Sequence, residues 1–166
     1  MVVHRKSWTA AALTAGAVAA VAVGASMFWN AERGAASSVR LRPDDAAFTA
    51  LGQKVYMAQC AACHGAALEG QPNWRERGPD GRLPAPPHDG SGHTWHHPDE
   101  LLFRITKHGV AKAAGIDGYV SAMPAYESVL SDQEIVAVLS WIKSQWPGPI
   151  RSRHDELNRL AEREKR

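Results

Sequence analysis

Residues Tyr56–Gly70 have the sequence "YMAQCAACHGAALEG" and hold the most informative motif of this chain. It contains both cysteines of the 166-residue sequence, Cys60 and Cys63, which are separated by two alanines and followed at once by His64. The chain has no other cysteine with which either thiol could pair. Two thiols and an imidazole this close together point to one chemical site.

The spacing of Cys60, Cys63 and His64 is that of c-type haem attachment, in which two thiols add across the two vinyl groups of haem and the adjacent His ligates the iron. A redox-active disulfide with a bystander His is one alternative, but that site lies near βαβ units, and this sequence shows no strand pattern. A zinc site is the other, and it needs further ligands, which "HDGSGHTWHH" (88–97) could supply. We favour haem because the helical pattern and the export signal described next agree with it independently.

An uncharged run, Ser7–Ala31, lies near the amino terminus directly after two basic residues. It is rich in Ala and Val and reaches the ~20 residues needed to cross a bilayer. Trp8 and Trp29 lie near its ends, where membrane spans carry aromatic belts. We predict that residues 1–31 are an uncleaved signal anchor with one transmembrane helix.

A cleaved secretory signal is the alternative, with Val23 and Ala25 as the small-residue cleavage site. In both cases the basic residues keep the amino end in the cytoplasm, and the chain after Asn30 crosses the membrane. The expected location is therefore the inner (cytoplasmic) membrane, single-pass, with the haem domain in the periplasm.

Length and charge restrict the remaining possibilities. A chain of 166 residues is long enough for one compact domain with a real core. Without Arg5 and Lys6 it has 17 basic and 17 acidic residues, so the exported part is neutral. No charge pattern typical of nucleic-acid binding occurs, and we expect no nucleic-acid partner.

Helical periodicity and start signals predict an all-α domain over residues 43–148. Residues 32–42 are small and polar and are interpreted as a linker, and the mostly charged tail, residues 149–166, is interpreted as a solvated, frayed helix. The segments 65–97 and 110–130 are interpreted as loops. Three helices are predicted. The first starts at Pro43–Asp45, and its apolar positions are Phe48, Leu51, Gly52, Val55 and Tyr56. The second starts at Pro98 and ends at Gly109, and the third starts at Ser131, where Glu134 completes a capping box, and ends before Pro147.

The segment 43–147 resembles the class I c-type cytochromes. The resemblance rests on "CAACHG" (60–65), on the pair Met123–Pro124 and on a last helix with an internal aromatic, Trp141. It implies a small helical bundle wrapped round one covalently held haem c, with the first and last helices crossing at right angles. It also implies that Gly52 and Tyr56 form a close contact with Trp141. The long insertion between Gly65 and His97 departs from the family pattern.

Met123 is the predicted second axial ligand of the iron, opposite His64. It lies 59 residues after His64 in a loop, and Pro124 favours an extended backbone there. Met57 is only one helical turn before Cys60, too close in sequence to reach the far face of a haem bound by His64. The Met–Pro pattern of the family supports the choice of Met123.

Four histidines, His88, His93, His96 and His97, lie within ten residues. We interpret them as a polar loop near the haem edge, where Trp95 or a His donates a hydrogen bond to a propionate. A bis-His haem and a second site for copper or zinc are the alternatives.

The segment "LPAPP" (83–87) resembles the proline segment of the family, in which a backbone carbonyl fixes the ring of the axial His. Pro86 is the predicted residue, and its two proline neighbours compete for the role.

An iron with both axial positions filled by protein has no open site for a substrate, which favours outer-sphere electron transfer. We therefore expect a membrane-tethered periplasmic carrier of single electrons between redox proteins at the membrane, not an enzyme, with no small-molecule substrate. Two alternatives stay open: a fixed haem subunit of a membrane oxidase or dehydrogenase complex, and a metal-handling protein that uses the histidine loop.

Overall fold

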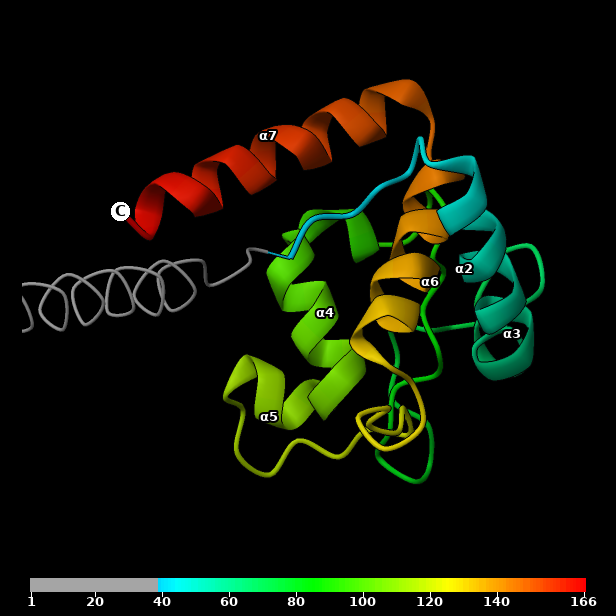
Figure 1. Ribbon diagram of the computed structural model, residues 1–166. Helices are drawn as coiled ribbons and strands as arrows, with labels where there is room; N and C mark the ends of the chain where they lie inside the picture. The colour runs from blue at the N-terminus through cyan, green and yellow to red at the C-terminus, as the bar shows by residue number, and fades with distance from the viewer. Residues whose placement is uncertain (1–38) are drawn as a thin grey trace, which may run out of the picture. The chain divides into compact units, whose positions relative to one another are not determined.

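A computed structural model describes residues 39–166 of the chain (Figure 1). In this range all regular secondary structure is helical and no strand occurs, so the predicted all-α class is confirmed there. The predicted anchor, residues 1–31, lies outside the described residues. Between residues 39 and 166 no helix is both long and apolar enough to span a bilayer. The elements are α2 (Ala46–Gln59), α3 (Ala61–His64), the 3-10 helix η1 (Thr94–His96), α4 (Asp99–His108), α5 (Val110–Ala114), α6 (Asp132–Ser144) and α7 (Gly148–Glu164).

The two main helices begin where their capping signals predict. Asp45 caps α2, and its side chain accepts a hydrogen bond from Phe48 N at 3.0 Å. Ser131 and Glu134 form the predicted capping box at the start of α6. Both predicted helix starts are confirmed. They could be predicted from the sequence because a cap depends only on residues three positions apart.

Helices α2 and α6 pack together at Gly52. A Cβ placed on Gly52 would lie 2.0 Å from Ala137 O and 2.8 Å from the Cβ of Trp141, so only glycine permits this approach. One turn further along α2, the Tyr56 ring lies 4.7 Å from the Trp141 ring between centroids. The predicted contact of Gly52 and Tyr56 with Trp141 is thus confirmed. The buried cluster around it includes Val55, Leu102, Phe103, Tyr126, Ile135, Val138, Leu139 and Ile142.

The predicted second helix is present as α4, but the segment that follows it differs from the prediction. Five residues of the expected loop form α5, which starts directly after Gly109. A single helical turn is too short for an apolar period to appear in the sequence.

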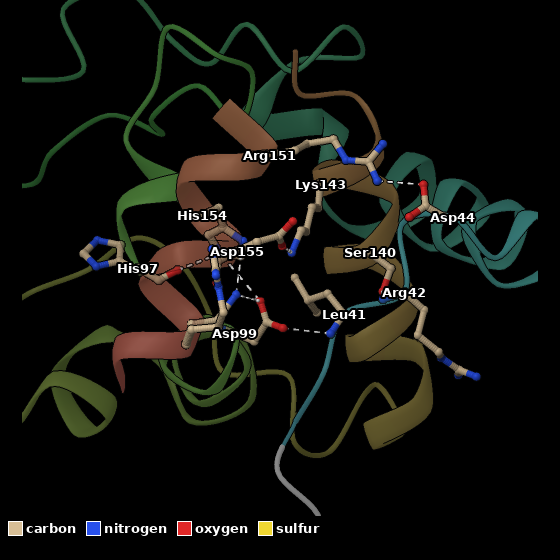
Figure 2. Close-up of polar contacts among 12 residues, drawn as sticks. Leu41, Arg42, Asp44, His97, Asp99, Ser140, Lys143, Arg151, His154 and Asp155 are labelled. Carbon is tan, nitrogen blue, oxygen red and sulfur yellow. Dashed lines mark hydrogen bonds and ion pairs between the residues drawn. The ribbon is translucent and has the colours of Figure 1, made fainter. Parts of the chain in front are cut away.

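Residues 39–42, which composition assigned to the linker, contact the domain. Leu41 is 8 % exposed, and its backbone N–H donates to Asp99 Oδ2 at 2.9 Å. The backbone N–H of Arg42 donates to Ser140 Oγ at 2.8 Å (Figure 2). Composition shows that this segment is small and polar, but it does not show that distant side chains accept hydrogen bonds from its backbone.

The tail also differs from the prediction, because α7 packs against the domain through one face. His154 is completely buried, its Nε2–H donates to His97 O at 3.0 Å, and its ring meets Trp146 edge to face. Lys143, 4 % exposed, donates to Asp155 (Figure 2). In Figure 1, α7 runs beside the extended segment that leads into α2, and the ion pair of Arg151 with Asp44 joins the two.

Candidate functional site

The cysteine pair and His64 lie together where α2 ends and the single-turn helix α3 begins. Cys60 is the C-cap of α2, and its carbonyl accepts hydrogen bonds from the backbone N–H groups of Cys63 and His64 at 3.1 and 2.9 Å. Residues three and four positions apart on a helix are neighbours, so this turn places both thiols and the imidazole side by side.

Both thiols are free, and they differ in exposure. Cys63 is exposed, whereas Cys60 is partly buried. Burial raises the pKa of the Cys60 thiol to about 11, with a smaller contribution from the neighbouring Cys63.

His64 is 8 % exposed and is held by the proline segment. Its Nδ1 lies 2.8 Å from Pro86 O, so Nδ1–H donates to the carbonyl and Nε2 is left as the nitrogen that can ligate a metal. Burial lowers the pKa of His64, which the hydrogen bond to Pro86 opposes in part. The contact is the one that the resemblance predicted for Pro86.

Gly70 makes this arrangement possible. It has a φ of +68°, and a Cβ on it would lie 2.4 Å from Pro87 N. Its backbone N–H donates to His64 O at 2.8 Å. The chain after the cysteine pair therefore passes directly against the Pro86–Pro87 peptide, because no side chain intervenes.

The loop that carries Met123 is fastened beside the cysteines. The hydroxyl of Tyr126 donates to Gln59 O at 2.9 Å, one residue before Cys60. Met123 itself packs against the core and is partly buried, whereas Met57 is 47 % exposed on α2. Ligation by Met123 stays a prediction.

Trp95 lies on η1 and carries an unpartnered donor. Its indole Nε1 is buried, and nothing within residues 39–166 accepts a hydrogen bond from it. Buried polar groups are nearly always paired, so this donor indicates an acceptor that does not belong to the described part of the chain.

Residues 49–146 match the family model described as cytochrome c. This chain belongs to the cytochrome c family. Proteins of this family bind haem c covalently and typically carry electrons rather than act as enzymes. No curated protein and no solved structure shows significant similarity to the chain.

The residues of this cytochrome c fit the haem that its family implies. Cys60 and Cys63 supply the two thiols, and His64 presents Nε2 beside them. The buried Nε1–H of Trp95 suits an anionic acceptor such as a haem propionate. These donors come from two segments that are far apart in the sequence, so the fit does not rest on the motif alone.

The histidine loop separates into exposed and inward-facing members. His93 and His96 are exposed, and they stack on Trp74 and Trp95 with centroid distances of 5.3 and 3.7 Å. Within residues 39–166, no group of three or more His, Cys, Asp or Glu side chains is placed to hold a metal ion.

His88 faces the opposite way and stacks on His64, with ring centroids 3.9 Å apart and ring planes at 23°. Two imidazoles that ligate opposite faces of one haem have the iron between their nitrogens and cannot stack face to face. The bis-His alternative is therefore wrong for His88. Burial, with His64 and His93 nearby, holds the pKa of His88 well below its usual range.

Sequence reasoning grouped His88 with its loop neighbours and missed this contact. The available signal was its position in the sequence, two residues after Pro86.

Proposed function

We propose that this protein is a monohaem class I cytochrome c that carries single electrons, with His64 and Met123 as axial ligands. The observation that carries the proposal is one hydrogen bond. His64, on the Cys60–His64 turn, donates it to the backbone carbonyl of Pro86. It holds Nδ1 and leaves Nε2 to ligate, which is the arrangement that a proximal haem ligand needs. The fastening of the Met123 loop to Gln59 supports the choice of the second ligand.

When bound, haem c supplies a one-electron iron couple. The chain's own part is to hold it and to close it off. Cys60 and Cys63 would hold it through their thiols, and His64 and Met123 would ligate the iron, which would leave no position for a substrate. Tyr56 and Trp141 are buried and pack against each other behind the turn.

We further propose that the domain is tethered to the periplasmic face of the inner membrane. The uncharged run Ser7–Ala31 and the basic residues before it support this proposal. Because residues 39–42 contact the domain, the proposed tether shortens to residues 32–38. A short tether gives a high effective concentration near redox partners in the same membrane.

A potentiometric titration of the purified wild type, followed in the visible spectrum, tests the carrier function. We expect one reversible transition with a slope of ~59 mV per decade, as for a single electron. We also expect no carbon monoxide binding in the ferrous state, because both axial positions are filled. Ready binding of carbon monoxide would contradict the proposal.

A mild detergent extract, sized before and after a salt wash, separates the free carrier from a fixed subunit. We expect the haem protein to migrate alone. Recovery in a stoichiometric complex with other membrane proteins would support the subunit alternative and overturn the carrier.

A further inference from the structure

We propose that His88 is a positioning residue that fixes the plane of the His64 ring. The inference rests on the proposed ligation of haem by His64. It concerns one contact, the stacking of the two imidazoles at 3.9 Å and 23°.

The two contacts of His64 restrict different motions of its ring. The hydrogen bond from Nδ1 to Pro86 O, 2.8 Å long, fixes one point on the ring edge. The ring turns about its Cβ–Cγ bond, and the hydrogen bond limits that turn without blocking it, because a hydrogen bond tolerates a range of angles. A flat side chain packed against its face blocks the turn, and His88 is that side chain.

His88 is itself held by three separate segments. Its backbone N–H donates to Leu68 O at 2.8 Å, and its carbonyl accepts from Trp146 Nε1 at 2.7 Å. Its ring Nδ1 lies 2.8 Å from Thr94 Oγ1. The two backbone contacts place the residue, and the contact with Thr94 sets the rotation of its ring.

Leu68 adopts a strained backbone at the point where it holds His88. Its φ is +69°, in the left-handed region that side chains other than glycine rarely adopt, and its side chain is 4 % exposed. Such conformations are unfavourable and persist where the surrounding structure over-determines them. The strain agrees with a fixed position for His88.

Space filling alone does not account for the residue type. A leucine of similar size would fill the same space. A histidine there buries ring nitrogens, and burying them costs free energy unless each has a hydrogen-bond partner. Here the chain supplies a partner, Thr94, which is itself 6 % exposed. An imidazole also gives His64 a flat face to pack against, which an aliphatic side chain does not.

The test uses the proton NMR spectrum of the ferric, haem-loaded protein. The hyperfine shifts of the haem methyl groups depend on the orientation of the axial imidazole plane, so they report the quantity in question directly. Four variants are compared with the wild type: His88→Leu, His88→Phe, Thr94→Val and the matched control His93→Leu, which removes an exposed imidazole of the same loop.

We expect His88→Leu to redistribute the methyl shifts and to move the reduction potential. His88→Phe keeps a flat ring and should stay close to the wild type. Thr94→Val frees the His88 ring and should change the shifts in the same sense as His88→Leu, by less. His93→Leu should leave the spectrum unchanged.

A wild-type shift pattern in His88→Leu would overturn the positioning role. If His88→Leu does not mature, the comparison of Thr94→Val with the wild type is the test. Unchanged methyl shifts in Thr94→Val would also overturn the positioning role of His88. Failure of the proposed function looks different, because wild-type protein without covalent haem would give no hyperfine-shifted spectrum in any variant.

Discussion

Met123 and Met57 are matched side chains in different surroundings. Met123 packs against the core in the loop fastened to Gln59, and Met57 is exposed on α2. A thioether is a soft ligand that favours ferrous iron, so Met123→Ala should lower the reduction potential and allow the ferrous protein to bind carbon monoxide. Stability should suffer less, because Met123 is only partly buried and takes no part in the close approach of α2 and α6 at Gly52.

Met57→Ala is the control, and it should leave both the potential and carbon monoxide binding unchanged. The weak charge-transfer band of Met-ligated ferric haem is a second readout for the same pair. If Met123→Ala keeps this band, or if the wild type lacks it and a histidine substitution in the 88–97 loop changes carbon monoxide binding, Met123 is not the ligand.

Site residues were predictable from the sequence where the chemistry is local. Cys60, Cys63 and His64 lie within one turn, so their spacing alone indicated their role. The contact of Pro86 with His64 was predictable only through the resemblance to the c-type cytochromes. The stack of His88 on His64 was not predictable, because it depends on the path of residues 65–88, where no periodic element fixes the backbone.

At the scale of the elements, the close approach of α2 and α6 depends on Gly52. Gly52→Ala would place a Cβ 2.0 Å from Ala137 O, and the two helices would have to separate. We expect a loss of ~1–3 kcal/mol in the free energy of unfolding, the usual cost of overpacking, measured by urea denaturation of the haem-loaded protein.

Gly148→Ala is the matched control for this prediction. Gly148 starts α7, and no atom beyond its chain neighbours lies within 4 Å of a Cβ there, so the same substitution should cost clearly less than Gly52→Ala, although Pro149 restricts the residue before it. Equal losses in both variants would show that the α2–α6 contact is not the sensitive point.

Helix α7 is held through a buried neutral histidine. His154 Nε2–H donates to His97 O, which leaves Nδ1 to accept a hydrogen bond from Asn158 Nδ2 at 3.3 Å. A proton on Nδ1 would set two donors against each other. Burial, followed by the nearby Lys143, lowers the pKa of His154, and Asp99 and Asp155 oppose this in part.

Stability should therefore depend on pH through His154. In the window between the lowered pKa of the folded state and the usual value near ~6.5, the unfolded chain binds more protons, so stability falls as the pH falls. The slope from one such group is at most ~1.4 kcal/mol per pH unit. Urea denaturation of the wild type and of His154→Gln between pH 7.5 and pH 5 should give a flatter profile for the variant.

His96→Gln, an exposed histidine of the loop, serves as the control and should keep the wild-type slope. Parallel profiles for the wild type and His154→Gln would show that α7 does not depend on a neutral His154.

Capped helices with a long apolar stripe were predictable, and the remaining elements were not. Asp45 and Ser131 mark the starts of α2 and α6, and each capping signal lies within four consecutive residues. His154 is the one buried residue of α7, and a single buried position in a charged sequence gives no periodic signal. The contact of Leu41 with Asp99 joins residues 58 positions apart, beyond the reach of any local pattern.

At the scale of the whole molecule, the proposed anchor makes the location testable. The protein should stay in the membrane pellet through a high-salt wash, because an apolar span is not released when charges are screened, and detergent should release it. Mass spectrometry should place its amino terminus near Met1. A soluble protein that begins just after Ala25 would show that the segment is a cleaved signal.

Covalent haem on Cys60 and Cys63 is the claim on which the rest depends, and haem staining of a denaturing gel tests it most directly. Only thioether links keep haem on a chain that has unfolded. Wild-type protein matured in an export-competent host should stain at its own mass, and the Cys60→Ala, Cys63→Ala double variant should not. An unstained wild type would contradict the assignment of this chain as a haem-carrying cytochrome c.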